Sequence, residues 1–241
     1  MDSDFDDLLC TRYPTIFRDR HASMQQTAMC WGFACGNGWF PLIDTLCAEI
    51  QRHVKFARVQ PVVAVQVKEK FGALRFYISG GDSYTRGLIW LADALSAVIC
   101  EDCGAPALSS GSGWIVTRCA DHGGVDFPLD QHRRYGDDDE PDDHRLVTPE
   151  KLAVWERAKN FRLPPTRTRG WRHIALALEH TIRNDLRHNG MPGITIVDSD
   201  EGSGLRYEWM GGDDQGRLRS IFRLADAYAA RCDRLTGKPA V

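Results

Sequence analysis

Apolar residues recur every four positions in two stretches of the chain that lie about 132 residues apart. One is FPLIDTLCAEI, which follows Gly38-Trp39, and the other is RHIALALEHTI, which follows Gly170-Trp171. This recurrence is that of the buried stripe of an amphipathic helix. The pattern therefore predicts a Gly-Trp turn and a core-facing helix in each half. The corresponding apolar positions are Leu42 and Ile174, Leu46 and Leu178, and Ile50 and Ile182.

Stretches rich in β-branched residues follow each helix and predict two strands in each half. VVAVQV at 62–67 corresponds to ITIVDS at 194–199. LRFYISGGD at 74–82 corresponds to LRYEWMGGD at 205–213, and each runs into a Gly-Gly-Asp turn that can supply positive φ angles. A second helix follows, carrying LADA at 91–94 and at 224–227. Each half is thus predicted as helix, strand, strand, helix.

This order predicts an α+β fold made of two divergent tandem α-β-β-α units that pack pseudo-symmetrically. A two-stranded hairpin alone is marginal in water, so each unit leaves surface for the other to bury. The alternative is chance similarity among short helices and hairpins. The predicted segments are an N-terminal helical arm at 1–30, a first unit at 31–99, a cysteine-containing insertion at 100–124, a connector at 125–165 and a second unit at 166–241.

The connector combines an acidic run, Asp137 to Asp143, with the pair Pro164-Pro165, which is typical of a solvated loop. Within it, Thr148-Pro149-Glu150 supplies a capping hydroxyl, a proline and an acid in front of KLAVWERAKN. This start predicts a short helix. The acidic run could instead imitate nucleic-acid phosphates for a partner, although a solvated loop is the simpler interpretation.

Composition narrows the function classes. Hydrophobic residues make up 43% and charged residues 26% of the chain, and the formal net charge is −3. The basic excess of proteins that bind nucleic acid non-specifically is lacking. The start MDSDFDDLLCTRYP has no basic segment followed by an apolar one, and no apolar run approaches the roughly 18 residues of a membrane span. We expect a cytoplasmic protein without membrane contact, whose 8 cysteines stay reduced.

Three of these cysteines and one histidine have the spacing C-x2-C-x15-C-x2-H, namely Cys100, Cys103, Cys119 and His122. Zinc prefers four thiolate or imidazole ligands in a tetrahedron, and two close pairs joined by a short hairpin meet that demand. The stretch from Trp114 to Thr117 is predicted to be the strand that delivers the second pair. The spacing therefore predicts one structural Zn²⁺ per chain in a zinc ribbon at 100–124, with no open coordination position for catalysis.

Other interpretations of Cys100 and Cys103 are a thiol-disulfide pair, an iron-sulfur ligand set and unligated core cysteines. A reactive thiol pair normally begins a helix, whereas this pair follows one. The second half offers a comparison, because it has Asp233 and Thr236 at the corresponding positions but keeps Gly237 and Pro239. We therefore predict that the ribbon is an appendage on a fold that forms without it.

Basic and aromatic residues on the predicted strands suggest one binding face. Because alternate residues of a strand share a face, only part of each strand can be available. Such a face could stack bases and bind phosphates of a nucleic acid. Its residues are Lys68, Lys70, Arg75 and Tyr77, with Arg206 in the second half.

A metal-dependent nuclease is a weaker alternative. Lys68 and Glu69 end the first strand, and Asp44 or Glu49 lies upstream, as carboxylates and a lysine do around a divalent metal. A solvated end of the hairpin explains the same charges. The sequence contains no GxSxG, P-loop or dinucleotide-binding fingerprint.

Four motifs together, CWGFACGNGW, QVKEKFGALRFY, CEDCG and GWIVTRCADH, make residues 30–123 resemble a family of small uncharacterised zinc-ribbon proteins of phages and bacteria. The resemblance implies zinc at the four ligands above and a setting in phages or mobile elements, but no activity, and it covers the first half only. Our first hypothesis is a non-enzymatic zinc-binding adaptor or regulator that acts on a protein partner. The second is nucleic-acid binding through the ribbon and the basic face, and the third is the nuclease.

Overall fold

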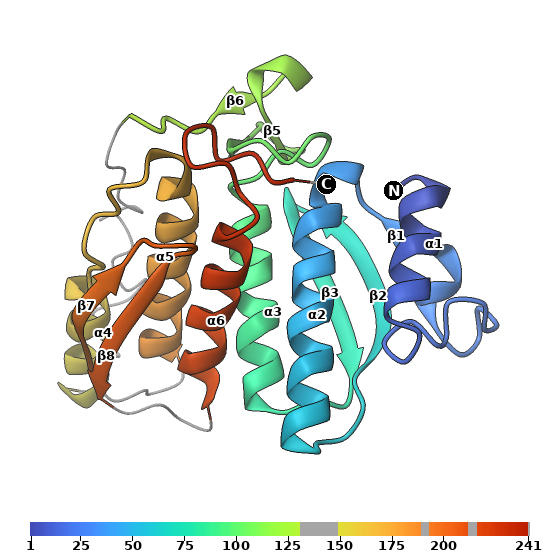
Figure 1. Ribbon diagram of the computed structural model, residues 1–241, viewed down its shortest axis with the longest axis horizontal. Coiled ribbons are helices and arrows are strands. Elements are labelled where there is room, and N and C mark those ends of the chain that lie inside the picture. Colours follow the sequence, from blue (N-terminus) through green and yellow to red (C-terminus); the bar gives the residue numbers. More distant parts are fainter. Residues whose placement is uncertain (131–148, 189–192, 212–215, 241) are drawn as a thin grey trace.

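The computed structural model describes residues 1–130, 149–188, 193–211 and 216–240, and the fold is α+β (Figure 1). The acidic run from Asp137 to Asp143 lies outside the described residues, as do Gly212 and Asp213 of the second Gly-Gly-Asp turn. The helices that the structure describes include none with both the length and the apolar character needed to cross a lipid bilayer.

The first half contains a helix, a three-stranded sheet, two further helices and a small ribbon of three strands. Its elements are α1 (Ser3–Arg12), η1 (Ala28–Trp31), β1 (Phe33–Ala34), η2 (Asn37–Trp39), α2 (Phe40–Ala57), β2 (Val63–Lys70), β3 (Ala73–Ser79), α3 (Ser83–Ser96), β4 (Ala107–Ser110), β5 (Val116–Arg118), η3 (Ala120–His122) and β6 (Val125–Asp126).

The second half repeats the order helix, strand, strand, helix after one extra helix. Its elements are α4 (Pro149–Asn160), η5 (Arg169–Trp171), α5 (Arg172–His188), β7 (Ile194–Asp200), β8 (Arg206–Gly211) and α6 (Arg217–Ala229). The helices and strands predicted for the two units are present, and so is the short helix predicted in the connector.

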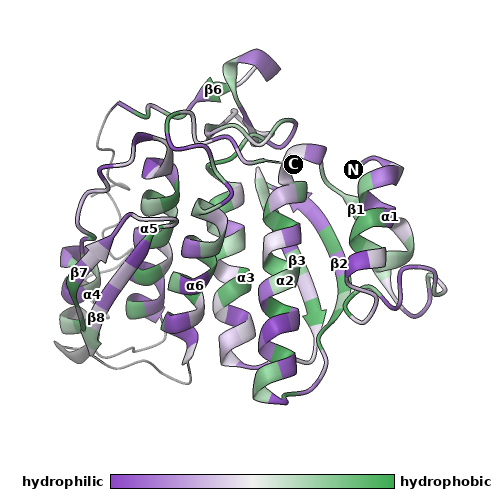
Figure 2. Cartoon of the chain, viewed as in Figure 1, coloured by the Kyte–Doolittle hydropathy of each residue, from purple (hydrophilic) through white to green (hydrophobic). Residues whose placement is uncertain are grey.

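One hydrophobic core runs through both halves. The tryptophans of the two Gly-Trp turns, Trp39 and Trp171, are both buried in it, together with apolar stripes of α2, α3, α5 and α6. Figure 2 shows hydrophobic and hydrophilic bands recurring along these helices, as amphipathic packing requires. The helices α3 and α6 lie side by side at the centre, between α2 and α5. The two predicted units therefore share a core.

The two hairpins correspond in detail. The antiparallel pair β2–β3 carries a bulge between Ala64 and Gln66, and the pair β7–β8 carries one between Ile196 and Asp198. In the first half β1 adds a third strand, parallel to β2, whereas among the described residues β7 and β8 form a sheet of two strands. The positions that correspond to β1 are Pro165 and Thr166, and a proline has no N–H to donate to a ladder.

These correspondences agree with two copies of one unit. That the halves arose by duplication and pack about a pseudo-twofold axis stays a prediction, and so do the predicted segment boundaries.

Candidate metal centre

The first ligand pair lies on a turn that is attached to the body of the protein. After α3 the chain passes Ile99, whose carbonyl oxygen accepts a hydrogen bond of 3.0 Å from the indole N–H of Trp39. The N–H of Gly104 donates to the carbonyl oxygen of Cys100 over 2.9 Å and closes the turn, and Gly104 has a φ of +76°. A left-handed residue here favours glycine. Cys100 and Cys103 are thus held on a tight turn, which we call the first knuckle (residues 100–106).

The first Gly-Trp turn lies directly against this knuckle. A Cβ atom on Gly38 would lie 2.4 Å from the carbonyl oxygen of Cys100 and 2.5 Å from the amide nitrogen of Cys103. The N–H of Gly38 donates to the carbonyl oxygen of Glu101 over 2.7 Å. The first knuckle is therefore built into the fold, while the β4–β5–β6 ribbon beyond it projects from the body (Figure 1).

The second ligand pair comes from this ribbon, whose strand order is β5-β4-β6. Cys119 directly follows β5, and His122 ends the single turn of η3. The N–H of Gly124 donates to the carbonyl oxygen of Cys119 over 2.9 Å, and the N–H of Ala120 donates to Oδ1 of Asp126 over 2.9 Å. These bonds fold the chain back so that Cys119 and His122 face the first knuckle.

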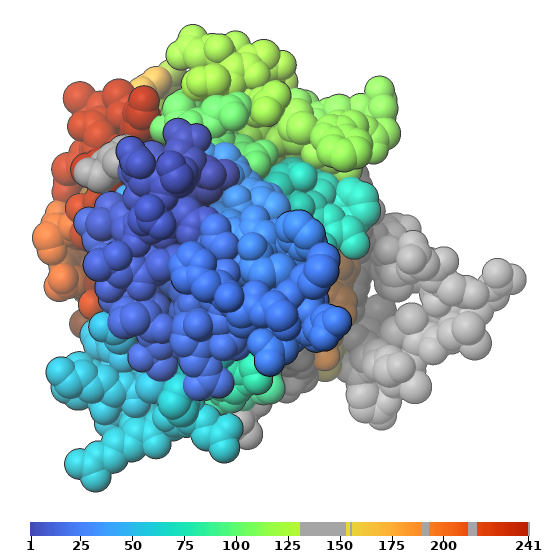
Figure 3. Space-filling model, turned by 90° about the vertical axis from the view of Figure 1, so that its right-hand side faces the viewer, coloured from blue at the N-terminus to red at the C-terminus, as the bar shows by residue number. Residues whose placement is uncertain are grey.

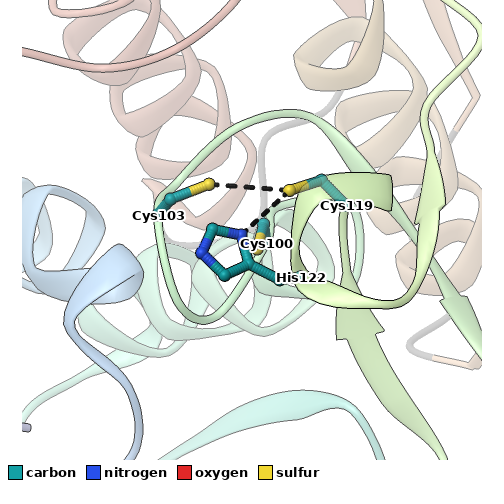
Figure 4. A group of neighbouring side chains, drawn as sticks. All are labelled: Cys100, Cys103, Cys119 and His122. Carbon is teal, nitrogen blue, oxygen red and sulfur yellow. Dashed lines mark hydrogen bonds between the residues drawn. The ribbon is translucent and has the colours of Figure 1, made fainter.

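All four ligand atoms lie within 4.8 Å of one another (Figure 4). Sγ of Cys103 is 3.7 Å from Sγ of Cys119, and Nδ1 of His122 is 3.6 Å from Sγ of Cys100 and 3.2 Å from Sγ of Cys119. A tetrahedron with Zn–S bonds of about 2.3 Å and a Zn–N bond of about 2.0 Å has S–S edges of about 3.8 Å and S–N edges of about 3.5 Å. The side chains thus have the mutual spacing of a tetrahedral site.

Burial favours the protonated form of the cysteine thiols, and a protonated thiol is a poor metal ligand. Burial is the largest cause that raises the pKa of Cys103 to about 12, and it also raises the pKa of Cys119. A bound divalent cation would deprotonate these thiols, so metal binding would release protons here. Three sulfur atoms and one imidazole suit zinc, and four protein ligands leave no position for a reacting water. The cluster can hold a metal ion, and zinc fits its ligand chemistry.

Of the residues predicted to form one binding face, some remain exposed and the two arginines are engaged in ion pairs. Lys68 Nζ lies 5.8 Å from the ring centre of Tyr77, which is an exposed side chain. Arg75, however, forms an ion pair with Asp93 of α3, and Arg206 forms one of 3.3 Å with Asp226 of α6. The two arginines hold strand to helix at corresponding places in the two halves.

Lys70 lies at the end of β2, with its Nζ 5.1 Å from the ring centre of Phe71. It is exposed, as is Phe71. Lys68, Lys70 and Tyr77 therefore remain together on the β2–β3 hairpin as candidate binding residues.

The carboxylates considered for a nuclease are engaged elsewhere. Asp44 pairs with Arg12 and Arg231, and it also accepts a hydrogen bond from the Tyr13 hydroxyl. Glu49 pairs with Arg223 across the α2–α6 interface. Within the part of the chain that the structure describes, the only group of three or more acidic, histidine or cysteine side chains placed to hold a metal ion is the Cys₃His cluster.

Exposed apolar side chains at the tip of the ribbon were not predicted. The strand expected from Trp114 begins only at Val116, so that prediction was wrong at its start. Trp114 lies in the turn and is 80% exposed, and Ile115 is 38% exposed. The Gly-Ser run before Trp114 is a signal that could have placed this tryptophan in a turn.

No protein-family model, curated protein or solved structure matches the chain.

Proposed function

We propose that this is a non-enzymatic zinc-binding protein, an adaptor or regulator that recognises a protein partner with a surface of its ribbon. The observation that carries the proposal is the apolar group Phe71, Trp114 and Ile115, which we call the ribbon face. These side chains are 64%, 80% and 38% exposed. Large apolar side chains that remain exposed on adjoining segments favour an interaction site, because aromatic residues are enriched in protein interfaces.

Contacts between the ribbon and the body support a preformed surface. The hydroxyl of Thr117 in β5 donates to the carbonyl oxygen of Gly72 over 2.6 Å. A Cβ on Gly72 would lie 3.0 Å from Cγ2 of Ile115. Figure 3 shows the ribbon directly above the residues of the β2–β3 turn. A surface held in place before binding loses less conformational entropy when a partner docks.

Zinc has a structural role in this proposal. Cys100 and Cys103 belong to the body and Cys119 and His122 to the ribbon, so one ion would tie the ribbon to the body. The closed set of four protein ligands argues for this role over activation of water. A setting in phages or mobile elements rests on the resemblance of residues 30–123 alone.

The metal part of the proposal is tested by metal analysis of the purified chain. We expect one zinc per chain, which Cys100→Ser and Cys119→Ser remove. Cys30→Ser is the matched control, because this thiol lies outside the cluster and donates to the carbonyl oxygen of Thr27. A chain without stoichiometric zinc, or a Cys119→Ser chain that keeps it, would contradict the proposal.

The partner is tested by capture from lysate at two salt concentrations, with and without nuclease treatment. We expect a protein whose capture survives nuclease and is lost on Trp114→Ala. Trp31→Ala is the control, because Trp31 is 68% exposed and lies outside the ribbon face. Capture that depends on nucleic acid, or that both variants retain, would count against a protein partner.

Nucleic-acid binding is a second candidate, favoured by the placement of Lys68 beside Tyr77 and Lys70 beside Phe71. A cation next to an exposed ring can contact a phosphate while the ring stacks on a base. Binding of single-stranded DNA should then weaken steeply with salt and on Lys70→Ala. Salt-independent binding would exclude this candidate.

A further inference from the structure

The helices α2 and α6 are joined by a group of ion pairs. Arg223 of α6 donates to both carboxylate oxygens of Glu49, each over 3.0 Å. Arg52 of α2 donates to the same carboxylate over 2.6 Å. The side chain of Glu49 is only 8% exposed. Three long charged side chains thus fill the space between these two helices.

The interface between α3 and α5 has other residues at the corresponding positions. Trp90 corresponds to Arg223, Thr181 to Glu49 and Asn184 to Arg52. Where the α2–α6 interface has two arginines and a glutamate, the α3–α5 interface thus has a tryptophan, a threonine and an asparagine. Here the structure has a cleft of about 440 Å³, lined by Trp90, Thr181 and Asn184 among others. Its size lies within the range of small-molecule sites, which is about 300–1,000 Å³.

The two carboxylates that line the cleft, Asp93 and Asp185, already have cationic partners. Asp185 is fully buried and pairs with Arg217, with 2.8 Å between Oδ1 and Nε. The guanidinium carbon of Arg217 lies 5.6 Å from the ring centre of Trp90. Asp93, at the rim, pairs with Arg75. Because these carboxylates have cationic partners, the cleft offers little net charge to attract an ion, and an uncharged ligand suits it better.

The remaining lining offers a stacking surface and hydrogen-bonding groups. Trp90 is 37% exposed and presents an aromatic ring at the cleft. Nδ2 of Asn184 lies 2.8 Å from Nε2 of His180. If this amide nitrogen donates to the imidazole, one N–H and the amide oxygen of Asn184 remain, an adjacent donor and acceptor. Such a pair complements the edge of a base that carries neighbouring ring nitrogen and amino groups.

We propose that the cleft between α3 and α5 binds an uncharged planar nitrogen heterocycle of nucleoside size, stacked on Trp90 and hydrogen-bonded by Asn184. This site is separate from the ribbon face and does not depend on the metal. It gives the protein a place to bind a small molecule in addition to a macromolecular partner.

The test is calorimetric titration of the full chain with adenosine, and with arginine as a cationic probe. We expect saturable adenosine binding that Trp90→Ala weakens about 5- to 150-fold, the loss that removal of one base–aromatic stack causes. Asn184→Ala should weaken it further. Phe56→Ala is the control, because this exposed residue of α2 holds the position that corresponds to His188.

A double variant provides an independent test. Trp90→Arg with Thr181→Glu introduces the residues of the Arg223–Glu49 pair, which already spans the gap between α2 and α6. It should fill the cleft and abolish adenosine binding while the melting temperature stays near that of the parent chain. If the double variant fails to fold, the loss of adenosine binding on Trp90→Ala remains as the test of the proposal. Absence of saturable adenosine binding at millimolar concentration, binding that both Trp90 variants retain, or binding of arginine in place of adenosine would overturn the proposal.

Discussion

The turn that begins at Cys100 and the turn that begins at Asp233 follow the same path after their helices. In each, the N–H of a glycine donates over 2.9 Å to the carbonyl oxygen four residues earlier, from Gly104 to Cys100 and from Gly237 to Asp233. The two glycines have φ angles of +76° and +73°. We call the turn at residues 233–239 the second knuckle.

The two knuckles differ in the side chain at their first position, which is Cys100 in the first and Asp233 in the second. In the second knuckle, Oδ1 of Asp233 accepts hydrogen bonds from the N–H groups of Leu235 and Thr236, over 3.0 and 2.7 Å, and from the Thr236 hydroxyl over 2.9 Å. A carboxylate thus occupies the place of the first cysteine, and these hydrogen bonds lower its pKa. The turn forms without thiols, so a metal is not needed to make it. The cysteines of the first knuckle lie instead beside Cys119 and His122 of the ribbon, in a cluster that can hold a metal ion.

The two knuckles also contact each other reciprocally. A Cβ on Gly104 would lie 3.0 Å from Cγ of Pro239, and a Cβ on Gly237 would lie 2.7 Å from Cγ of Pro106. Each turn therefore packs its glycine against the proline of the other. This pattern is the one expected if two related units face each other across an axis.

The largest effect is expected where the Gly-Trp turns meet the knuckles. Gly38→Ala would place a Cβ 2.4 Å from a backbone oxygen of the first knuckle, and Gly170→Ala would place one 2.3 Å from the Asp233 oxygen. Main-chain atoms of the knuckle cannot move away from the added Cβ without distorting the turn. Each variant should therefore lose about 3 kcal/mol or more of unfolding free energy, measured in urea titrations. Only Gly38→Ala should also reduce zinc content.

Gly193→Ala is the control for this pair, because nothing lies within 4 Å of its added Cβ. It should change stability by less than about 0.5 kcal/mol. If Gly38→Ala and Gly170→Ala lower zinc content equally, metal binding depends on both knuckles and the predicted difference between them is wrong.

The next effect concerns pH and the second knuckle. His173 is fully buried against Gly237, and burial lowers its pKa to about 3. The unfolded chain binds the proton near pH 6.5, so the contribution of neutral His173 is complete above that value and is lost as the pH falls toward 3. Between pH 7 and pH 5 this loss is about 2 kcal/mol. Urea titrations of the parent chain and of His173→Leu at both pH values measure it.

Acid also removes metal from cysteine sites, but that loss is common to both proteins. The difference between their pH dependences therefore isolates His173. Equal pH dependence of the unfolding free energy in the two proteins would contradict the prediction, because it would mean that protonation of His173 does not destabilise the folded state.

A smaller effect is expected from the carboxylate of the second knuckle. Asp233→Ala removes the acceptor of three hydrogen bonds and should lower the melting temperature, by less than the glycine variants do. Asp233→Asn keeps Oδ1 as an acceptor and should recover most of the loss. Zinc content should stay at the parent value in both. A loss of zinc on Asp233→Ala would mean that the first knuckle depends on the second for its shape.

The smallest effect on stability is expected at the exposed tips. Trp114 on the ribbon is 80% exposed and Leu235 on the second knuckle is 68% exposed. Replacement of either by alanine should change the unfolding free energy by less than about 0.5 kcal/mol. Only Trp114→Ala should reduce capture of a partner. Equal loss of capture from both variants would place the interaction on the shared knuckle surface and not on the ribbon.

Local patterns were sufficient for the helix-strand-strand-helix order of each half and for the four residues of the Cys₃His cluster, but they did not predict β1 or β6. Helices and strands follow from apolar spacing, and the short helix α4 follows from its Thr-Pro-Glu start. The four side chains of the Cys₃His cluster were predicted from their spacing alone, and the structure brings their ligand atoms within 4.8 Å of one another. Chemistry confined to a few neighbouring residues can thus be inferred without a structure.

Contacts between distant segments could not be inferred in this way. The bond from Thr117 to Gly72 that forms the ribbon face joins segments 45 residues apart. The pairing of Arg75 with Asp93, which takes this arginine from the predicted binding face, depends on how α3 packs on β3. The cleft at Trp90 is lined by residues of α3 and α5, two helices that are far apart in the sequence. No local pattern carries these facts.

The reciprocal packing of Gly104 on Pro239 has a consequence for the order in which the chain is made. Pro239 is synthesised 135 residues after Gly104, which at about 5–20 residues per second takes roughly 7–27 s. During that interval the first knuckle has emerged but the proline that covers its glycine does not yet exist. A metal ion bound by the Cys₃His cluster would hold the ribbon against the first knuckle during that interval, before Pro239 is available to cover Gly104.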